Sequence, residues 1–174
     1  MMPRLVLIAG PNGAGKTNFA RQYLPVLERD MAFVNADEIA REMRAQGFSQ
    51  AHADIRSGRA MLERIEQLIG IGADLTIETT LASLSYAQKI PAWRRLGYRV
   101  ALIYLRLPNP ERSVERVRRR VAAGGHGVPE EVIRQRFAKS VEYLETRYKP
   151  IVDEWYIVDS LEGGFELAEW WNDS

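Results

Sequence analysis

Leu5-Val-Leu-Ile-Ala-Gly10-Pro-Asn-Gly-Ala-Gly15-Lys16-Thr17 is the stretch of sequence that decides the fold of this chain. Its first five residues form a continuous apolar run, which is typical of a strand buried on both faces of a parallel sheet. Two glycines five positions apart then precede Lys16 and Thr17, and a helical pattern begins at once. A strand, a glycine-rich loop and a helix in this order predict a phosphate-binding loop.

Each part of this loop has a chemical task in binding ATP with Mg²⁺. The glycines let backbone N–H groups curl around phosphate oxygens, and the N-terminus of the following helix adds a partial positive charge. Lys16 is expected to reach the β- and γ-phosphates, and the Thr17 hydroxyl to bind Mg²⁺. The predicted nucleotide-binding residues are Gly10, Pro11, Asn12, Gly13, Ala14, Gly15, Lys16 and Thr17. A glycine-rich turn that precedes a lysine by chance is the alternative, and the flanking strand and helix disfavour it.

Strands and helices alternate along the rest of the chain. This order implies βαβ crossovers, and so an α/β, three-layer P-loop NTPase fold with a parallel sheet and helices on both faces. The segment 161–174 fits either a strand or a helix. Further strands are expected at 32–35, 75–78, 99–105 and 155–159, and helices at 16–24 (ending before Pro25), 37–44, 50–69, 83–96 (interrupted at Pro91), 111–122 and 129–147.

Composition narrows the classes of protein to consider. A chain of 174 residues, with 46% hydrophobic and 27% charged residues, predicts one globular domain over 1–174. No apolar run approaches the roughly 20 residues that span a bilayer, so a cytoplasmic protein without a membrane partner is expected. The absence of cysteine, with His52 and His126 far apart, excludes disulfides and a typical zinc site. A net charge of +1 gives no support to nucleic-acid binding.

Two carboxylates follow predicted strands at the sheet edge where ligands of α/β proteins collect. Asp37 is expected to accept the proton of an attacking hydroxyl, although it could instead only cap the next helix. Glu78 is expected to hold Mg²⁺, or to contact an acceptor together with Thr79 and Thr80, rather than be a plain exposed strand end. Asp159 is the other strand-end acid that could hold Mg²⁺ in a switch or motor protein.

Arginines concentrate in a segment that could cover the phosphates. Nine Lys or Arg against six acidic residues occur in 111–147, which predicts an arginine-bearing helical lid over about 112–147. Arg120 lies nearest the glycines at 124–127. Arg134 and Arg136 fall on opposite flanks of their helix, because each residue advances about 100°, so only one of them can face the phosphates. The alternative is a solvated helix face with local ion pairs.

Taken together, four segments resemble the zeta-toxin-like P-loop kinases: 10–17, Asn35-Ala-Asp37-Glu-Ile39, Glu78-Thr-Thr80, and 116–137 with its Gly-Gly-His-Gly-Val-Pro run. The resemblance implies ATP-dependent phosphorylation of a sugar hydroxyl, with UDP-N-acetylglucosamine as acceptor and an antitoxin protein as a possible partner. It also implies roles for single residues. Lys16 and Thr17 hold phosphates and Mg²⁺, Asp37 is the base, Glu78 contacts the acceptor, and Arg120 and Arg134 clamp the γ-phosphate.

Two other functions fit the same residues. A nucleoside, nucleotide or antibiotic kinase would share the loop, Asp37 and an arginine lid. A non-catalytic regulatory module would bind ATP without transferring phosphate. The chain is also shorter than the founding toxins of the family that it resembles, and it lacks most of their C-terminal helical part. Because that part helps to frame the acceptor site, the identity of the acceptor stays open.

Overall fold

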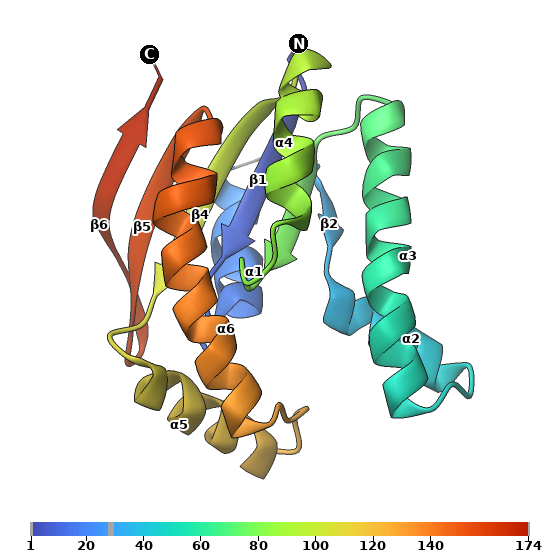
Figure 1. The fold of residues 1–174 in the computed structure, drawn as a ribbon, viewed down its shortest axis with the longest axis vertical. Helices are drawn as coiled ribbons and strands as arrows, with labels where there is room; N and C mark the ends of the chain where they lie inside the picture. Colours follow the sequence, from blue (N-terminus) through green and yellow to red (C-terminus); the bar gives the residue numbers. More distant parts are fainter. Residues whose placement is uncertain (1, 28–29, 174) are drawn as a thin grey trace.

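The computed structural model describes residues 2–27 and 30–173, and a single six-stranded sheet organises them. The strand order is β2-β3-β1-β4-β5-β6, with β1 in the middle between β3 and β4 (Figure 1). The strands are β1 Arg4–Ala9, β2 Ala32–Val34, β3 Leu75–Thr79, β4 Arg99–Arg106, β5 Glu154–Leu161 and β6 Gly164–Asn172.

The first five strands are parallel, and β6 turns back antiparallel to β5. The predicted α/β fold, with a parallel sheet and helices on both faces, is therefore confirmed, and one antiparallel strand is added at the edge of the sheet. The segment 161–174, for which the sequence allowed a strand or a helix, contains the strand β6. A tight turn at Gly163, with φ of +82°, makes this reversal possible, since parallel pairing would need a long crossover.

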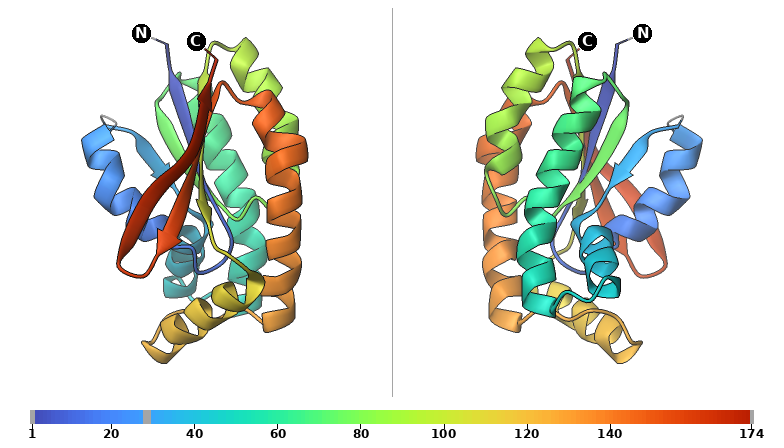
Figure 2. Two further views of the ribbon diagram at one scale, coloured as in Figure 1. Left: turned by 90° about the vertical axis from the view of Figure 1, so that its left-hand side faces the viewer. Right: turned by 90° about the vertical axis from the view of Figure 1, so that its right-hand side faces the viewer.

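Helices cover both faces of the sheet (Figure 2). Residues of α1 pack on one face, and residues of α3, α4 and the end of the α6 segment pack on the other. The α5 helix lies across the end of the sheet opposite the two chain termini (Figure 1). The helices are α1 Lys16–Leu27, α2 Ala36–Ala45, α3 Gln50–Gly70, α4 Ser85–Arg95, α5 Pro110–Ala122, α6 Glu130–Tyr143, the π-helical η1 Leu144–Tyr148 and the 3₁₀ turn η2 Lys149–Ile151.

Two prolines do not end or interrupt their helices, contrary to the sequence prediction. Pro25 lies in the last turn of α1, so the one hydrogen bond that its missing N–H removes lies at the end of the helix. Pro91 lies in the middle of α4, which runs unbroken. Ile90 and Trp93 on either side of it are 0% and 2% exposed, and this burial offsets the lost backbone hydrogen bond.

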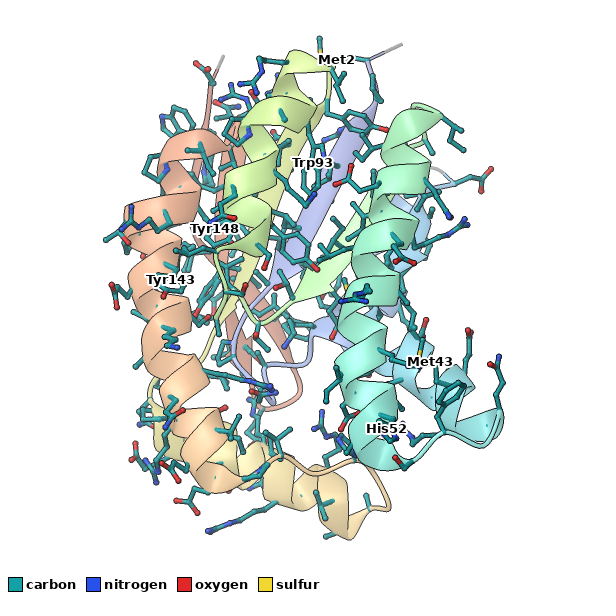
Figure 3. All side chains as sticks on the ribbon, turned by 45° about the vertical axis from the view of Figure 1, so that its right-hand side comes forward. Met2, Met43, His52, Trp93, Tyr143 and Tyr148 are labelled. Carbon is teal, nitrogen blue, oxygen red and sulfur yellow. The ribbon has the colours of Figure 1, made fainter. Side chains whose placement is uncertain are left out.

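Large apolar side chains hold the sheet against the helices. In β1, Leu5, Leu7 and Ile8 are all 0% exposed, as expected of a central parallel strand. Trp93 and Tyr148 fill the space between the helices and the sheet (Figure 3). This core fixes the carboxyl ends of the parallel strands, and these ends carry the residues discussed next.

No helix within 2–27 and 30–173 combines the length and the apolar character needed to cross a membrane.

Candidate nucleotide and phosphoryl-transfer site

The glycine-rich loop between β1 and α1 is packed so closely that side chains would not fit at two of its positions. A Cβ at Gly10 would lie 2.5 Å from the Leu105 carbonyl oxygen. A Cβ at Gly13 would lie 2.9 Å from Cβ of Arg116, and Gly13 has φ of +79°, which favours glycine. The loop is therefore held between the end of β4 and helix α5.

Lys16, the first residue of α1, points back into this loop. Its side chain is buried, and Nζ donates to the carbonyl oxygens of Gly10 at 3.0 Å and Pro11 at 3.1 Å. Burial lowers the pKa of Lys16, while the negative charges of Glu78 and Asp37 act in the opposite direction. An ammonium group has three N–H donors, so one remains for a phosphate oxygen.

Three polar side chains from three segments meet next to Lys16. Glu78, at the end of β3, accepts through Oε2 from Thr17 Oγ1 at 2.9 Å and from Asn35 Nδ2 at 2.7 Å. Burial raises the pKa of Glu78, and the nearby Lys16 charge partly counteracts this rise. The structure thus brings together two predicted site residues, Thr17 and Glu78, and adds Asn35.

The Thr17 and Glu78 oxygens are suited to a magnesium ion. Mg²⁺ is usually held by one or two carboxylates together with phosphates of the substrate, rather than by a cage of protein ligands. No group of three or more His, Asp or Glu forms a metal cluster in the part of the chain that the structure describes. These two oxygens, next to the loop, would hold Mg²⁺ with the phosphates of a bound nucleotide.

Asp37 lies in the first turn of α2, and its side chain is exposed. The residue that caps α2 is Asn35, whose Oδ1 accepts from the Asp37 N–H at 2.7 Å, so the interpretation of Asp37 as the cap is wrong. The charge of Asp37 acts on the pKa of both Lys16 and Glu78, which places it within electrostatic reach of the loop. A proton acceptor at the mouth of the site requires this combination of access and proximity.

The chain turns sharply just after Glu78. Leu81 has φ of +61°, an unusual value for a residue with a branched side chain, yet it is fully buried. The Thr79 hydroxyl accepts from the Leu81 N–H at 3.0 Å and so stabilises this turn. Thr79 therefore has a structural contact of its own, and the half-buried Thr80 lies beside it at the strand end.

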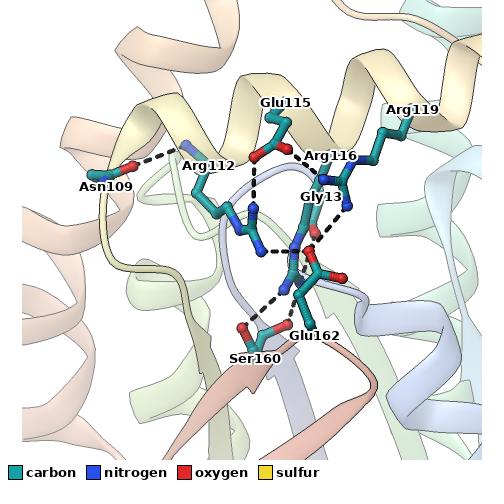
Figure 4. A network of polar contacts seen from close by, with 8 residues as sticks. All are labelled: Gly13, Asn109, Arg112, Glu115, Arg116, Arg119, Ser160 and Glu162. Atoms are coloured by element: carbon teal, nitrogen blue, oxygen red, sulfur yellow. Dashed lines mark hydrogen bonds and ion pairs between the residues drawn. The ribbon is translucent and has the colours of Figure 1, made fainter.

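Helix α5 is anchored on the loop by a polar network (Figure 4). The Ser113 hydroxyl donates to the Asn12 carbonyl oxygen, and Arg116 donates to the Gly13 carbonyl oxygen at 3.5 Å. Arg116 also donates to the hydroxyl and carbonyl oxygens of Ser160 at 2.6 and 3.0 Å. Glu162 joins the same network through Arg112 and Arg119. The first half of the predicted lid is therefore fixed to the loop.

The three candidate lid arginines have different surroundings. Arg134 is paired with Glu111 at 2.6 Å and with Glu130 at 3.0 Å. Arg120 donates through Nε to the His126 carbonyl oxygen at 3.1 Å. The charges of Arg120 and Arg136 lower the pKa of Lys16, in addition to its burial. The positive charges of Arg120 and Arg136 therefore act on Lys16 in the loop.

Two other polar residues named in the sequence analysis, Asp159 and His52, have partners of their own. Asp159 binds Arg106 through both carboxylate oxygens, at 2.6 and 3.0 Å, and this contact lowers the pKa of Asp159. In this structure the Asp159 carboxylate is therefore engaged in a salt bridge. His52 lies at the start of α3, where its Nδ1 is 3.0 Å from Ser49 Oγ (Figure 3).

The sequence profile of a family described as an AAA domain matches residues 5–145. A curated relative, an uncharacterized protein of Haemophilus influenzae, is 25% identical over 140 residues, which are 79% of this chain and 94% of the relative. The residues matched by the family profile include the glycine-rich loop and Glu78, so this match covers the segment that carries the candidate site.

Solved structures with the same fold include a chain of a toxin–antitoxin system, a chain of a complex with ATP, and a kinase. A chain of the PezAT system of Streptococcus pneumoniae has a TM-score of 0.70 at 20% identity, with 97% of this chain and 72% of that chain covered. A chain of the AvrRxo1-ORF1:-ORF2 complex with ATP has a TM-score of 0.74 at 21% identity, covering 97% and 58%. Shikimate kinase of Acinetobacter baumannii, in complex with shikimate, has a TM-score of 0.55 at 18% identity, covering 94% and 86%. At these identities the likeness establishes the fold of the P-loop kinases.

Proposed function

The chain belongs to the AAA domain family, and from its site we propose that it is an ATP-dependent kinase that phosphorylates a hydroxyl group of a small molecule. The observation that carries the proposal is the 2.9 Å contact between Thr17 and Glu78 beside the buried Lys16. In P-loop enzymes a hydroxyl and a carboxylate in this position hold Mg²⁺ against the β- and γ-phosphates. When bound, Mg²⁺ would neutralise the negative charge that develops on the phosphates.

The transfer needs a base for the acceptor, and we assign this role to Asp37. The acceptor oxygen would attack the γ-phosphorus, and the bond from that phosphorus to the oxygen bridging the β- and γ-phosphates would break. ADP would leave, and the acceptor's proton would pass to the Asp37 carboxylate. Asp37 suits this task because it is exposed to an incoming acceptor and its charge acts on both Lys16 and Glu78.

For the acceptor we propose a UDP-sugar such as UDP-N-acetylglucosamine, bound near Glu78 and Thr80. The support is the resemblance of segments 10–17, 35–39, 78–80 and 116–137 to the zeta-toxin-like kinases, together with the fold shared with a PezAT chain. An antitoxin partner is part of the same proposal. Of the two alternative functions, another small-molecule kinase would phosphorylate a different acceptor, and a regulatory module would transfer no phosphate. One assay therefore separates them.

The assay incubates the purified chain with ATP, Mg²⁺ and a panel of UDP-sugars, nucleosides and aminoglycosides, and detects products by mass. The expected result is a gain of one phosphoryl group by a UDP-sugar. A phosphorylated nucleoside or antibiotic would move the chain to another class of kinase. ATP binding with only slow hydrolysis, and no phosphorylated product, would refute the kinase proposal and favour a regulatory module.

Arg120 and Arg136 are proposed as the lid arginines that stabilise the charge on the transferred phosphoryl group. Arg136→Ala is expected to lower the transfer rate by about 10²-fold, because the variant loses a donor to the transition state. Arg134→Ala is the matched control on the same helix. It should change the rate less than about threefold, since an exposed ion pair contributes little. Single-turnover transfer measures both rates. A larger loss in Arg134→Ala than in Arg136→Ala would instead assign the contact with the γ-phosphate to Arg134, as the family resemblance implies.

A further inference from the structure

Asn35 lies between β2 and α2, and the residue is only 5% exposed. Both polar atoms of its amide are used. Oδ1 accepts from the Asp37 N–H at 2.7 Å, and Nδ2 donates to Glu78 Oε2 at 2.7 Å. The Asn35 backbone carbonyl also accepts from the Ile39 N–H at 3.2 Å and so begins the helix. One side chain thus connects the start of α2 to the end of β3.

Capping alone does not require asparagine at this position. Serine, threonine and aspartate also cap helices well, because capping needs only a side-chain acceptor. Asparagine adds an N–H donor, and here that donor points to the same carboxylate oxygen that Thr17 contacts. Aspartate would cap equally well but would place a second negative charge against Glu78.

A second asparagine cap in the same chain provides the contrast. Asn109 caps α5 by accepting from the Arg112 N–H at 2.9 Å, and its side chain is exposed. The two caps share the helix-starting contact. What distinguishes Asn35 is its burial and its bond to a strand-end carboxylate 43 residues away.

We propose that Asn35 is a positioning residue for phosphoryl transfer: it fixes the Glu78 carboxylate toward Thr17 and, through the same amide, the backbone of Asp37. The proposal rests on the function proposed above. It explains how the residue assigned to Mg²⁺ and the residue assigned to the proton keep a constant separation, although they lie on different elements. Both Asn35 bonds are short, and the side chain is shielded from competing water.

The test is Mg²⁺-dependent ATP binding, which requires no acceptor. Calorimetry on the full chain gives the Kd for ATP in EDTA and in Mg²⁺, and the ratio of the two measures the tightening due to the metal. Asn35→Ser keeps the cap acceptor but is too short to reach Glu78. We expect the ratio to fall about tenfold, as for the loss of one hydrogen bond to a charged group, with the Kd in EDTA nearly unchanged. Asn109→Ser, the matched cap variant, should leave the ratio as in the wild type.

A double-mutant cycle with Glu78→Gln shows whether Asn35 acts through Glu78. In the Glu78→Gln background the Asn35→Ser change should have little further effect on the ratio. An unchanged ratio in Asn35→Ser, full additivity in the cycle, or a wild-type chain without metal-dependent tightening would each overturn the proposal. Should the serine variant not fold, Asn35→Thr replaces it, since threonine also caps. Failure of the kinase proposal is separate, because it is scored by the acceptor panel and not by ATP binding.

Discussion

Replacement of Lys16 by methionine is expected to weaken the binding of Mg·ATP by about 10²-fold or more. The Lys16 ammonium is buried and held by two loop carbonyls, so its remaining N–H is directed at a bound phosphate. A charge-assisted hydrogen bond is about twice as strong as a neutral one, and a dry site strengthens it further. Methionine is also unbranched and is only one atom shorter, so that the loss measured is mainly that of the charged ammonium group. Calorimetry or a fluorescent ATP analogue reports the Kd.

The matched control for Lys16→Met is Lys139→Met, which changes an exposed lysine of α6 in the same way. It should leave the Kd unchanged. A second check is the pH dependence of wild-type binding. Burial lowers the pKa of Lys16, so the protonated form is lost at a lower pH than for an exposed lysine, and affinity should fall as pH rises through that lowered pKa. A Kd within about threefold of the wild type in Lys16→Met would contradict the assignment of the loop to phosphate binding.

The central fold was predictable because its signals are local and strong. The apolar run 5–9 and the glycines at 10 and 15 are required by the buried strand and the tight loop, whatever the rest of the chain does. The last strand was not predictable in this way. In β6, Leu167 is 56% exposed and Trp170 is 60% exposed, so no alternation of buried and exposed residues distinguishes a strand from a helix there.

The sequence indicated which residues could form the candidate site, but not the hydrogen bonds that connect them. The strand-end positions of Asp37 and Glu78 indicated a shared edge of the sheet. Asn35 was missed as a functional residue because an asparagine before a helix is typical of a cap, and its bond to Glu78 depends on tertiary structure. The available signal was its position, directly at the carboxyl end of the second strand. A polar residue that must be buried there is expected to serve a neighbour as well as the helix.

The sequence alone also could not decide which lid arginine faces the loop. Helical periodicity predicts that Arg134 and Arg136 lie on opposite flanks, but it cannot identify the flank that faces the loop. The choice depends on partners far away in the sequence, such as Glu111, which pairs with Arg134 in the structure. Only the packed hairpin of α5 and α6 distinguishes the two arginines.

Replacement of Asp37 by asparagine is expected to lower the rate of phosphoryl transfer by about 10²- to 10⁴-fold, the usual contribution of a general base. The affinity for Mg·ATP should change little, because Lys16 and the loop carry the nucleotide. Stability should change by less than about 1 kcal/mol, since Asp37 is exposed and is not the cap of α2, and only its interaction with the helix dipole is lost. Single-turnover kinetics with the acceptor identified in the panel gives the rate, and thermal unfolding gives the stability.

Glu38→Gln is the matched control for Asp37→Asn, because Glu38 lies in the same first turn of α2. Each substitution removes one negative charge from the N-terminus of this helix. The charges of both residues raise the pKa of Glu78, so both variants change the field there in the same direction. A large rate loss in Asp37→Asn alone therefore isolates proton transfer from that shared electrostatic effect. Equal losses in the two variants would assign the effect to the field at Glu78, and a loss confined to Glu38→Gln would move the base by one residue.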